Sequence, residues 1–404
     1  MREETLLTPL KVARKTTYLE WGSQPSLFKH YPRFCYRIAL EDLPELSWLS
    51  HLRYVTSERL IGGNPYYQLN VPSAGNLHPL EIYLQIRNVT GVLSGIYHLD
   101  PLNAQLVLIQ EIEGDGIEGA IGMEKRFNGV ILMVSLVPFR SFWKYGLRSW
   151  RYGYLDLGHQ LGAWYAIVRH FGLSLTKMSH IDALLLNTLM GMGEDEFIAA
   201  VYAVGEVGNR PVQPLQTPLM RVAPCDYTYR DDRMSKALIE APIYTDMPDF
   251  KPFYTDQFER LNRTRRSARE FFPSSMRDDA LETLMHVMAP PSLEIVAIVL
   301  QAHAMQPGVY RKATLSEAGD FRAQVLHLLL DQRFCASANM VLLIYAKQFN
   351  AAAHIEGGIF GEEIYLVSEH LGVGCSGIGA FYDNEGLYWS NNPLLYAVAI
   401  GGKL

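Results

Sequence analysis

Cysteine is scarce in this sequence, and the cysteines that are present stand far apart. The 404 residues include Cys35, Cys225, Cys335 and Cys375, with no Cys-x-x-Cys pair and no histidine cluster beside any of them. Zinc sites and disulfide frameworks both depend on recognisable cysteine spacings. We therefore expect reduced thiols, a cytoplasmic protein and no bound metal.

Long hydrophobic runs and a surplus of positive charge are also lacking. The longest apolar stretches, such as VILMVSLVPF from Val130, have the length of a strand and are too short to span a membrane. The N-terminal stretch MREETLLTPLKVARKTTYLE has no apolar core of the kind that a secretory signal needs. The formal net charge is −6, whereas nucleic-acid-binding domains are usually basic. We expect neither a membrane nor a nucleic acid as a partner.

The composition that remains, 49% hydrophobic and 19% charged, is that of a folded protein. A chain of this length exceeds one ordinary domain, so two domains are expected. Two similar segments, LGHQLGAWYAIVRHFG and GGIFGEEIYLVSEHLG, align at an offset of 200 that matches Gly158 with Gly358 and Tyr165 with Tyr365. Each segment reads as an amphipathic helix closed by a glycine.

Strand-like segments repeat in the same order as these helices. LEIYLQ aligns with LEIVAI at an offset of 213, and VILMVSLV has a partner in MVLLIYAK. Alternating apolar segments resemble one another by chance, but a shared order favours an internal duplication. The sequence predicts an α+β fold with two tandem domains, residues 1–207 and 253–404, joined by a proline-rich linker over residues 208–252.

The two halves differ in complementary ways. The second half contains RTRRSAREFF (Arg263–Phe272), a plausible phosphate clamp because guanidinium groups pair with phosphate oxygens, although a solvated basic loop is the alternative. The first half contains the tight turn PSAGNLH (Pro72–His78). Each segment is missing at the equivalent position of the other half. This complementary loss predicts one composite site between the halves.

Two further differences lie near the repeated helices. GVGCSGIGAFYD in the second half (Gly372–Asp383) has glycines that would let a flat ligand lie against the backbone, although a tight turn is the simpler alternative. The first half carries extra residues within SFWKYGLRSWRYGYLD, where Lys144 and Tyr145 are adjacent. Either could transfer a proton if burial shifted its pKa. The alternative is an aromatic helix start that packs on the core while Lys144 extends to solvent.

Three of these motifs resemble the flavin-binding nitroreductase family: RRSAR from Arg265, PSAGNLHPLE from Pro72 and GIGAFYD from Gly377. The closer resemblance is to the SagB-type dehydrogenase branch, which has counterparts of GIYHLDP and KYGLRSWRYGYLDLGH. The resemblance extends over nearly the whole chain from about Tyr18. Motif matches of this kind are hypotheses that the structural context has to support.

The resemblance implies two nitroreductase-like domains, each with a central, mostly antiparallel sheet flanked by helices, that form a pseudo-dimer within one chain. A further homodimer of such chains remains open. It also implies FMN as the cofactor, bound between the halves. The implied flavin-binding residues are Arg265, Arg266, Ser267 and Arg269 of the clamp, Pro72, Ser73, Ala74, Gly75 and Asn76 of the turn, and Gly377, Ile378 and Gly379 of the glycine-rich segment.

The implied activity is FMN-dependent oxidation of azoline rings to azoles in peptide natural products, with Lys144 and Tyr145 as catalytic proton-transfer residues. The implied partners are a small-molecule or peptide substrate and cyclodehydratase proteins. Two alternatives remain open at this point. One is reduction of nitro or quinone compounds by NAD(P)H. The other is a flavin-binding scaffold subunit without turnover.

Overall fold

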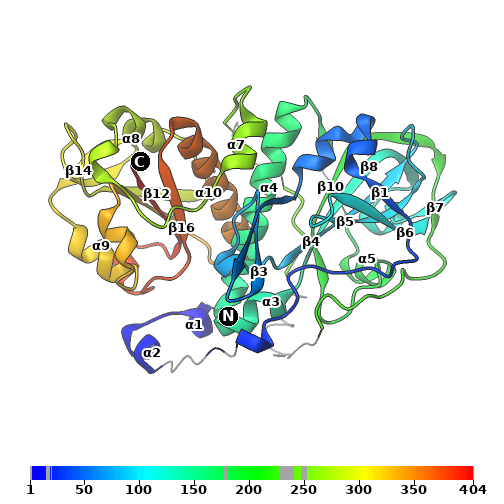
Figure 1. Ribbon diagram of the computed structural model, residues 1–404, viewed down its shortest axis with the longest axis horizontal. Helices are drawn as coiled ribbons and strands as arrows, with labels where there is room; N and C mark the ends of the chain where they lie inside the picture. The colour runs from blue at the N-terminus through cyan, green and yellow to red at the C-terminus, as the bar shows by residue number, and fades with distance from the viewer. Residues whose placement is uncertain are drawn as a thin grey trace.

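The computed structural model describes residues 2–14, 19, 21–176, 178, 180–226, 241–246 and 253–403. Within these residues, the strands form two large sheets, one from each half of the chain. Figure 1 shows the sheets at opposite ends of the molecule, with helices α4 (Ser149–His170) and α10 (Ala351–Leu371) side by side between them. The expected α+β fold with two sheet-and-helix domains is confirmed.

The first sheet has seven antiparallel strands in the order β1-β6-β5-β4-β8-β10-β9. Every residue of its central strand β4 is buried, because the sheet is covered on both faces. Leu84 of β4 lies opposite Tyr97 on one neighbour and Leu132 on the other. The strands are β1 (Arg37–Ala39), β4 (Leu80–Arg87), β5 (Gly95–Asp100), β6 (Gln105–Glu111), β8 (Lys125–Leu136), β9 (Leu175–Thr176) and β10 (Phe197–Pro211).

The second sheet has six antiparallel strands in the order β14-β13-β12-β15-β17-β16. Its run β13-β12-β15-β17 corresponds in order to β5-β4-β8-β10 of the first sheet. The repeated strand-like segments predict two of these correspondences, β12 with β4 and β15 with β8. The strands are β12 (Leu293–Val299), β13 (Gly308–Arg311), β14 (Thr314–Ala318), β15 (Met340–Ala346), β16 (Gly374–Ile378) and β17 (Leu394–Gly401).

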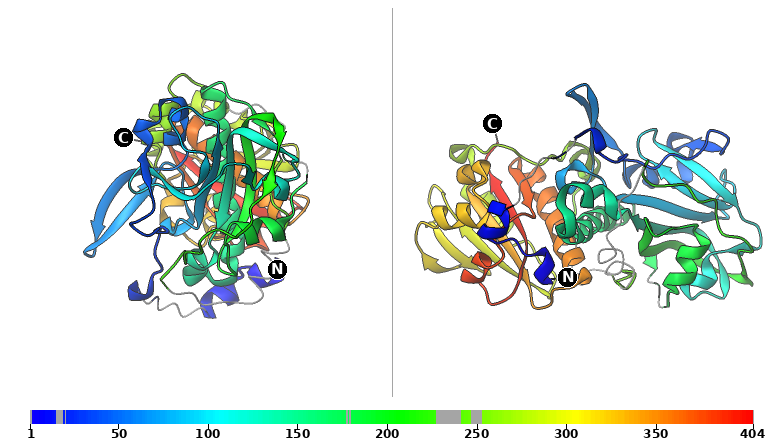
Figure 2. Two further views of the ribbon diagram at one scale, coloured as in Figure 1. Left: turned by 90° about the vertical axis from the view of Figure 1, so that its right-hand side faces the viewer. Right: turned by 90° about the horizontal axis from the view of Figure 1, so that it is seen from below.

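Smaller elements surround the two sheets. Strands β2 (Val55–Ile61) and β3 (Asn64–Leu69) form a hairpin that projects from the body of the molecule in both views of Figure 2. Strand β7 (Asp115–Gly116) pairs in parallel with β11 (Gln213–Pro214). The other α-helices are α1 (Arg2–Thr5), α2 (Pro9–Arg14), α3 (Pro138–Tyr145), α5 (Ala183–Leu189), α7 (Phe258–Thr264), α8 (Asp278–Met285) and α9 (Arg322–Leu328).

Short 3-10 helices complete the described structure. They lie in the connections between strands and helices, and two residues of η4 line the cavity between the halves. They are η1 (Trp21–Ser23), η2 (Leu40–Asp42), η3 (Pro44–His51), η4 (Ala74–Asn76), η5 (Glu118–Ile121), η6 (Gly146–Arg148), η7 (Pro273–Ser275), η8 (Arg333–Ser337) and η9 (Glu385–Tyr388).

Helices α4 and α10 touch at Gly158 and Gly358. A Cβ atom on Gly158 would lie 2.7 Å from the Cα atom of Gly358 and 2.0 Å from the carbonyl oxygen of Ile355. Only glycine allows so close an approach of the two backbones. All residues of α4 from Ser149 to Val168 are buried. The expectation of an amphipathic helix with one polar face is therefore wrong, because the other half of the chain covers the side that would otherwise face water.

The extra residues that the sequence predicts in the first half form helix α3. In this half, β8 ends at Leu136 and α4 begins at Ser149, and α3 lies between them. In the second half, β15 ends at Ala346 and α10 begins at Ala351. The insertion therefore adds a helix immediately before the long helix at the centre of the molecule.

Part of the proline-rich connection packs on the first sheet. Strand β10 continues through Pro211, beyond the predicted domain end at residue 207. Tyr244 forms an isolated parallel bridge with Ala200 of the same strand. Residues 227–240 and 247–252 lie outside the described residues. The boundaries 1–207, 208–252 and 253–404 therefore stay predictions.

Candidate functional site

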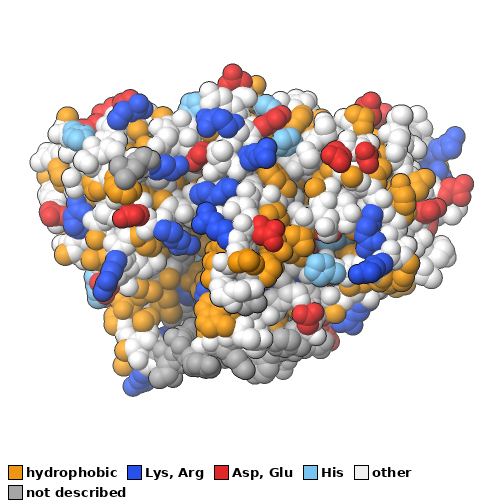
Figure 3. All heavy atoms as spheres, viewed as in Figure 1, with side chains coloured by type: hydrophobic (Ala, Val, Ile, Leu, Met, Phe, Trp, Pro, Cys, Tyr) orange, Lys and Arg blue, Asp and Glu red, His pale blue; other side chains and the backbone are white. Residues whose placement is uncertain are grey.

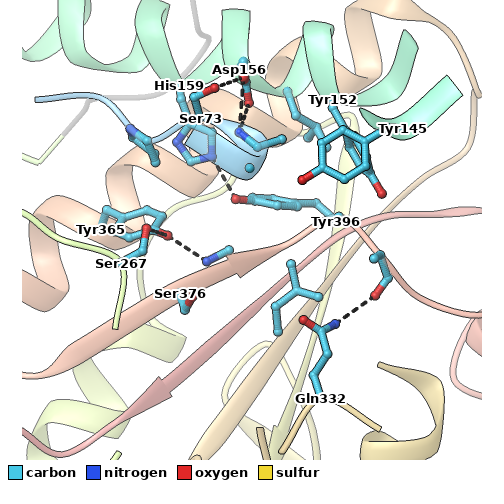
Figure 4. A pocket seen from close by; sticks show the side chains of 18 of the residues that line it. Ser73, Tyr145, Tyr152, Asp156, His159, Ser267, Gln332, Tyr365, Ser376 and Tyr396 are labelled. Carbon is cyan, nitrogen blue, oxygen red and sulfur yellow. Dashed lines mark hydrogen bonds between the residues drawn. The ribbon is translucent and has the colours of Figure 1, made fainter. Parts of the chain in front are cut away.

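A cavity of about 290 Å³ lies where the two halves meet. Its walls come from the turn after β3, from α3 and α4 of the first half, and from the clamp segment, α10, β16 and β17 of the second half (Figure 4). The lining residues are Pro72, Ser73, Ala74, Gly75, Lys144, Tyr145, Tyr152, Leu155, Asp156, His159, Ser267, Arg269, Gln332, Tyr365, Ser376, Gly377, Ile378, Gly379, Ala380 and Tyr396.

The turn at residues 72–76 is fastened to helix α4 by Asp156. The Asp156 carboxylate accepts hydrogen bonds from the Ser73 hydroxyl at 2.7 Å and from the Ala74 amide at 3.0 Å. Gly75 adopts a φ of 66°, in the left-handed region that favours glycine. Burial raises the pKa of Asp156 to about 6, although both hydrogen bonds favour the ionised carboxylate.

Asn76 belongs to the same turn but does not line the cavity. Its side-chain amide donates to the carbonyl oxygen of Tyr67 at 2.7 Å and so ties the turn to β3. The amide of His78 donates to the Ser73 hydroxyl oxygen at 3.0 Å. The structure therefore gives Asn76 a supporting position, while residues 72–75 face the cavity.

Ser267 and Arg269 of the clamp segment line the cavity from the second half. The Ser267 hydroxyl and the Tyr365 hydroxyl lie 2.8 Å apart. Ser267 also bridges Cys375 of β16 in parallel, which fixes the segment beside the second sheet. Arg269 is exposed, and Lys144 of the first half lines the same cavity, which therefore has a positive wall. Figure 3 shows Lys and Arg side chains near the middle of the face seen in Figure 1.

Neither Arg265 nor Arg266 lines the cavity. Arg265 is 3% exposed, and its guanidinium donates to the carbonyl oxygens of Asn70 at 2.7 Å and Leu69 at 3.1 Å. Arg266 donates to backbone carbonyl groups, including that of Thr56 at 3.1 Å. Arg265 thus joins the clamp segment of the second half to the chain that leads into the turn of the first half.

The glycine-rich segment approaches two tyrosines that line the cavity. A Cβ atom on Gly377 would lie 1.6 Å from the Tyr396 hydroxyl oxygen, and one on Gly379 would lie 2.4 Å from a ring carbon of Tyr152. The Gly377 amide donates to the Tyr365 hydroxyl at 2.7 Å. Any larger residue at either glycine would displace a wall of the cavity.

Lys144 and Tyr145 lie at the end of α3 and line the cavity from the first half. The Lys144 ammonium lies 5.5 Å from the Tyr145 ring centroid, and a Cβ atom on Gly75 would lie 2.3 Å from the Tyr145 hydroxyl oxygen. Burial, together with the charge of Arg269, lowers the pKa of Lys144. Burial raises the pKa of Tyr145. The lysine is therefore the better proton acceptor of the pair, and the tyrosine remains a proton donor.

Sequence reasoning missed several lining residues. Tyr152, Asp156 and His159 stand at spacings of four and three, which places them on one face of a helix, and this pattern could have revealed them. The repeat matches Tyr365 with Tyr165 but gives no reason to place Tyr365 at the site. Tyr396 stands among apolar residues of β17, so no local pattern marks it.

Membrane-spanning helices and clusters of metal ligands are not found in the described part of the chain. No helix there is both long and apolar enough to cross a bilayer. No three His, Cys, Asp or Glu side chains there come together as metal ligands would, and the four cysteines are free thiols.

Comparison with known proteins gives one curated relative. A Methanocaldococcus jannaschii protein with the name "Putative nitroreductase" is 34% identical over 112 residues, which are 27% of this chain and 56% of the relative. The chain thus spans a little more than half the length of the relative it matches. No protein-family model matches the chain.

Solved structures include one that matches along the whole chain. It is a "putative nitroreductase" from Anabaena variabilis, with a TM-score of 0.80 at 20% identity over 100% of this chain and 98% of its own. A chain of the E. coli microcin synthetase McbBCD complex matches over 52% of this chain and 86% of its own, with 15% identity and a TM-score of 0.33. The first match shows a shared, nitroreductase-like fold. The second is too weak to support an argument.

Proposed function

We propose that this chain is an FMN-dependent oxidoreductase that binds one flavin in the cavity between its halves. The observation that carries the proposal is the convergence of three segments on that cavity: the turn at 72–75, the Ser267–Arg269 segment and residues 377–379. These are the segments to which the family resemblance assigns flavin binding. The shared fold and the relative's name agree with this proposal.

Arg269 and Ser267 would hold the FMN phosphate. Arg269 makes no hydrogen bond or ion pair with any other described residue, so its guanidinium is available for a charge-assisted contact. The buried hydroxyl of Ser376, which also lines the cavity, lacks a partner in the described structure. A polar ligand would satisfy such a group, because buried polar atoms are normally hydrogen-bonded.

Residues 377–379 would support the flat ring of the cofactor, since their glycines bring backbone to the cavity wall. When bound, FMN supplies the two-electron acceptor that side chains lack. Oxidation of an azoline to an azole removes a hydride and a proton from the substrate ring. Lys144 would accept that proton, and Tyr145 would orient the substrate through its hydroxyl.

One flavin per chain is also part of the proposal. Tyr365 and Tyr165 occupy equivalent positions of α10 and α4 at the offset of 200. Tyr365 meets Ser267 of the clamp, whereas the Tyr165 hydroxyl donates to the backbone oxygen of Asp246 at 2.9 Å. The connecting segment 241–246 thus lies where a second clamp would have to stand, which supports a single composite site.

A second candidate activity is reduction of nitro or quinone compounds by NAD(P)H, which the name of the curated relative favours. One experiment separates the activities. The purified flavoprotein is mixed under anaerobic conditions with an azoline-containing peptide or with NAD(P)H, and the flavin absorbance is followed. Bleaching by the peptide supports the dehydrogenase, and bleaching by NAD(P)H alone supports the reductase. Bound flavin that neither compound bleaches would contradict both and favour a scaffold.

A further inference from the structure

A row of three hydrogen-bonded side chains leads from the core of the molecule to the cavity. His159 of α4 lies between Glu362 of α10 and Tyr396 of β17. Its Nδ1 atom lies 2.9 Å from the Glu362 carboxylate, and its Nε2 atom lies 3.0 Å from the Tyr396 hydroxyl. Figure 4 shows the Tyr396 hydroxyl pointing to His159 at the middle of the cavity. The row therefore joins both halves of the chain.

Glycines surround this row and leave room for it. A Cβ atom on Gly162 would lie 2.8 Å from the Glu362 Cβ atom. One on Gly361 would lie 3.1 Å from His159 Nε2 and 2.8 Å from a ring carbon of Tyr396, and Gly377 has the close contact with the Tyr396 hydroxyl noted above. The backbone therefore comes close to these side chains at three glycines, and the three side chains are tightly packed.

The hydrogen-bond roles follow from the chemistry of the three groups. A carboxylate only accepts hydrogen bonds, so the contact with Glu362 assigns a proton to His159 Nδ1. With the ring proton on Nδ1, the Nε2 atom is the acceptor and the Tyr396 hydroxyl donates to it. Burial raises the pKa of Tyr396, so the hydroxyl keeps its proton. The oxygen lone pairs of Tyr396 are then left for the cavity.

The row does not lead to solvent. Glu362 is 0% exposed, and its second carboxylate oxygen has no partner in the described structure. A proton passed along the row would therefore stop at a buried carboxylate. Fixing the direction of the Tyr396 hydroxyl is the role that this arrangement fits.

We propose that Tyr396 is a binding residue of the cavity, and that its oxygen accepts a hydrogen bond from a ring N–H of the reduced cofactor. His159 and Glu362 are positioning residues that hold the Tyr396 hydroxyl in this role. This inference rests on the proposed binding of FMN. Reduced flavin carries ring N–H groups that oxidised flavin lacks. A hydrogen-bond acceptor beside such a group therefore stabilises the reduced form relative to the oxidised form.

The test is the midpoint potential of bound FMN in wild-type protein and in the Tyr396→Phe variant, which keeps the ring and removes the hydroxyl. We expect about a tenfold loss of affinity for reduced relative to oxidised flavin, which lowers the potential by about 30 mV for a two-electron couple. Glu362→Gln should shift the potential in the same direction by a smaller amount, because the His159 tautomer is then less firmly held.

Tyr165→Phe is the matched control. It removes a buried tyrosine hydroxyl that bonds to Tyr202 and the Asp246 backbone, away from the cavity, and should leave the potential unchanged. An unchanged or raised potential in Tyr396→Phe would overturn the inference. A shift in Tyr396→Phe without any in Glu362→Gln would overturn the positioning role of the row. Wild-type protein that binds no FMN would instead contradict the proposed function.

Discussion

Arg265 and Arg269 lie four positions apart in one basic segment, yet their surroundings differ. Arg265 is buried and bonds to the backbone carbonyl groups of Leu69 and Asn70. Arg269 is exposed and lines the cavity. A buried guanidinium that satisfies backbone acceptors contributes mainly to stability, whereas an unpaired one beside a cavity is available to a ligand. We therefore expect the two arginines to have separable roles.

The first prediction concerns ligand binding by this segment. Arg269→Ala should weaken FMN affinity about ten- to a hundredfold, because charge-assisted hydrogen bonds contribute about 1.5–3 kcal/mol. Its melting temperature without FMN should stay close to that of the wild type. Titration with FMN by fluorescence quenching, with thermal melts of the apoprotein, measures both quantities.

Arg263→Ala is the control for this prediction. Arg263 is an exposed arginine of the same segment and does not line the cavity, so its loss should leave FMN affinity unchanged. Equal losses of affinity in both variants would mean that only the general positive charge of the segment matters.

The second prediction separates binding from chemistry at Lys144 and Tyr145. Both Lys144→Ala and Tyr145→Phe should keep FMN bound. Lys144→Ala should lower the rate of flavin bleaching by an azoline peptide about a hundredfold, the usual scale of general acid–base catalysis. Tyr145→Phe should lower the same rate because the hydroxyl that orients the substrate is lost. In wild-type protein the rate should rise with pH through a pKa below the ordinary lysine value of 10.5, since only neutral Lys144 accepts a proton. Bleaching at the wild-type rate in both variants would return the pair to a packing role.

At the scale of elements, the carboxyl group of Asp156 joins the turn at residues 72–75 to helix α4. Asp156 has a folded-state pKa of about 6 against an ordinary value of 3.8, with burial as the main cause. The folded state therefore binds this proton more tightly than the unfolded state. The resulting stabilisation is present in full below pH 4 and is lost as the pH rises through 6.

The third prediction follows from this loss of stabilisation at higher pH. Asp156→Asn resembles the protonated acid at all pH values, so its stability relative to wild type should increase from pH 4 to pH 6 by up to about 3 kcal/mol and then level off. Urea unfolding of both proteins across this range measures the difference. A difference that stays constant between pH 4 and pH 6 would show that Asp156 does not titrate there.

The sequence could locate the turn, the Ser267–Arg269 segment and residues 377–379, because each stands out against the matching segment of the other half. It could not tell which side chains of these segments face the cavity. Arg266 does not line the cavity, and its guanidinium donates to the carbonyl oxygen of Thr56 in the other half of the chain. A contact across so much sequence leaves no local pattern. Asn76 donates to the carbonyl oxygen of Tyr67, and nothing in the sequence marks that partner.

The fold was predictable for a related reason. The order of strand-like and helical segments repeats along the chain, and that order survives as the matching strand order of the two sheets. The burial of α4 and α10 on all sides was not predictable from one helix alone. It results from the close approach at Gly158 and Gly358, which only the assembled halves create.

At the scale of the whole molecule, we propose that the two halves form one composite flavin site. The first half contributes the turn, Lys144 and Tyr145, and the second contributes Ser267, Arg269 and residues 377–379. In the second half, Tyr365 contacts Ser267 of the clamp. In the first half, the equivalent Tyr165 bonds instead to the backbone of Asp246. We therefore propose that one chain binds one cofactor.

The flavin content of the purified protein tests this claim most directly. The protein is saturated with FMN, freed of excess cofactor and denatured, and the released flavin is quantified against the protein concentration. The composite site predicts one FMN per chain in the wild type, and a ratio well below one for Arg269→Ala prepared in the same way. A wild-type ratio near two, or near zero after saturation, would contradict the account.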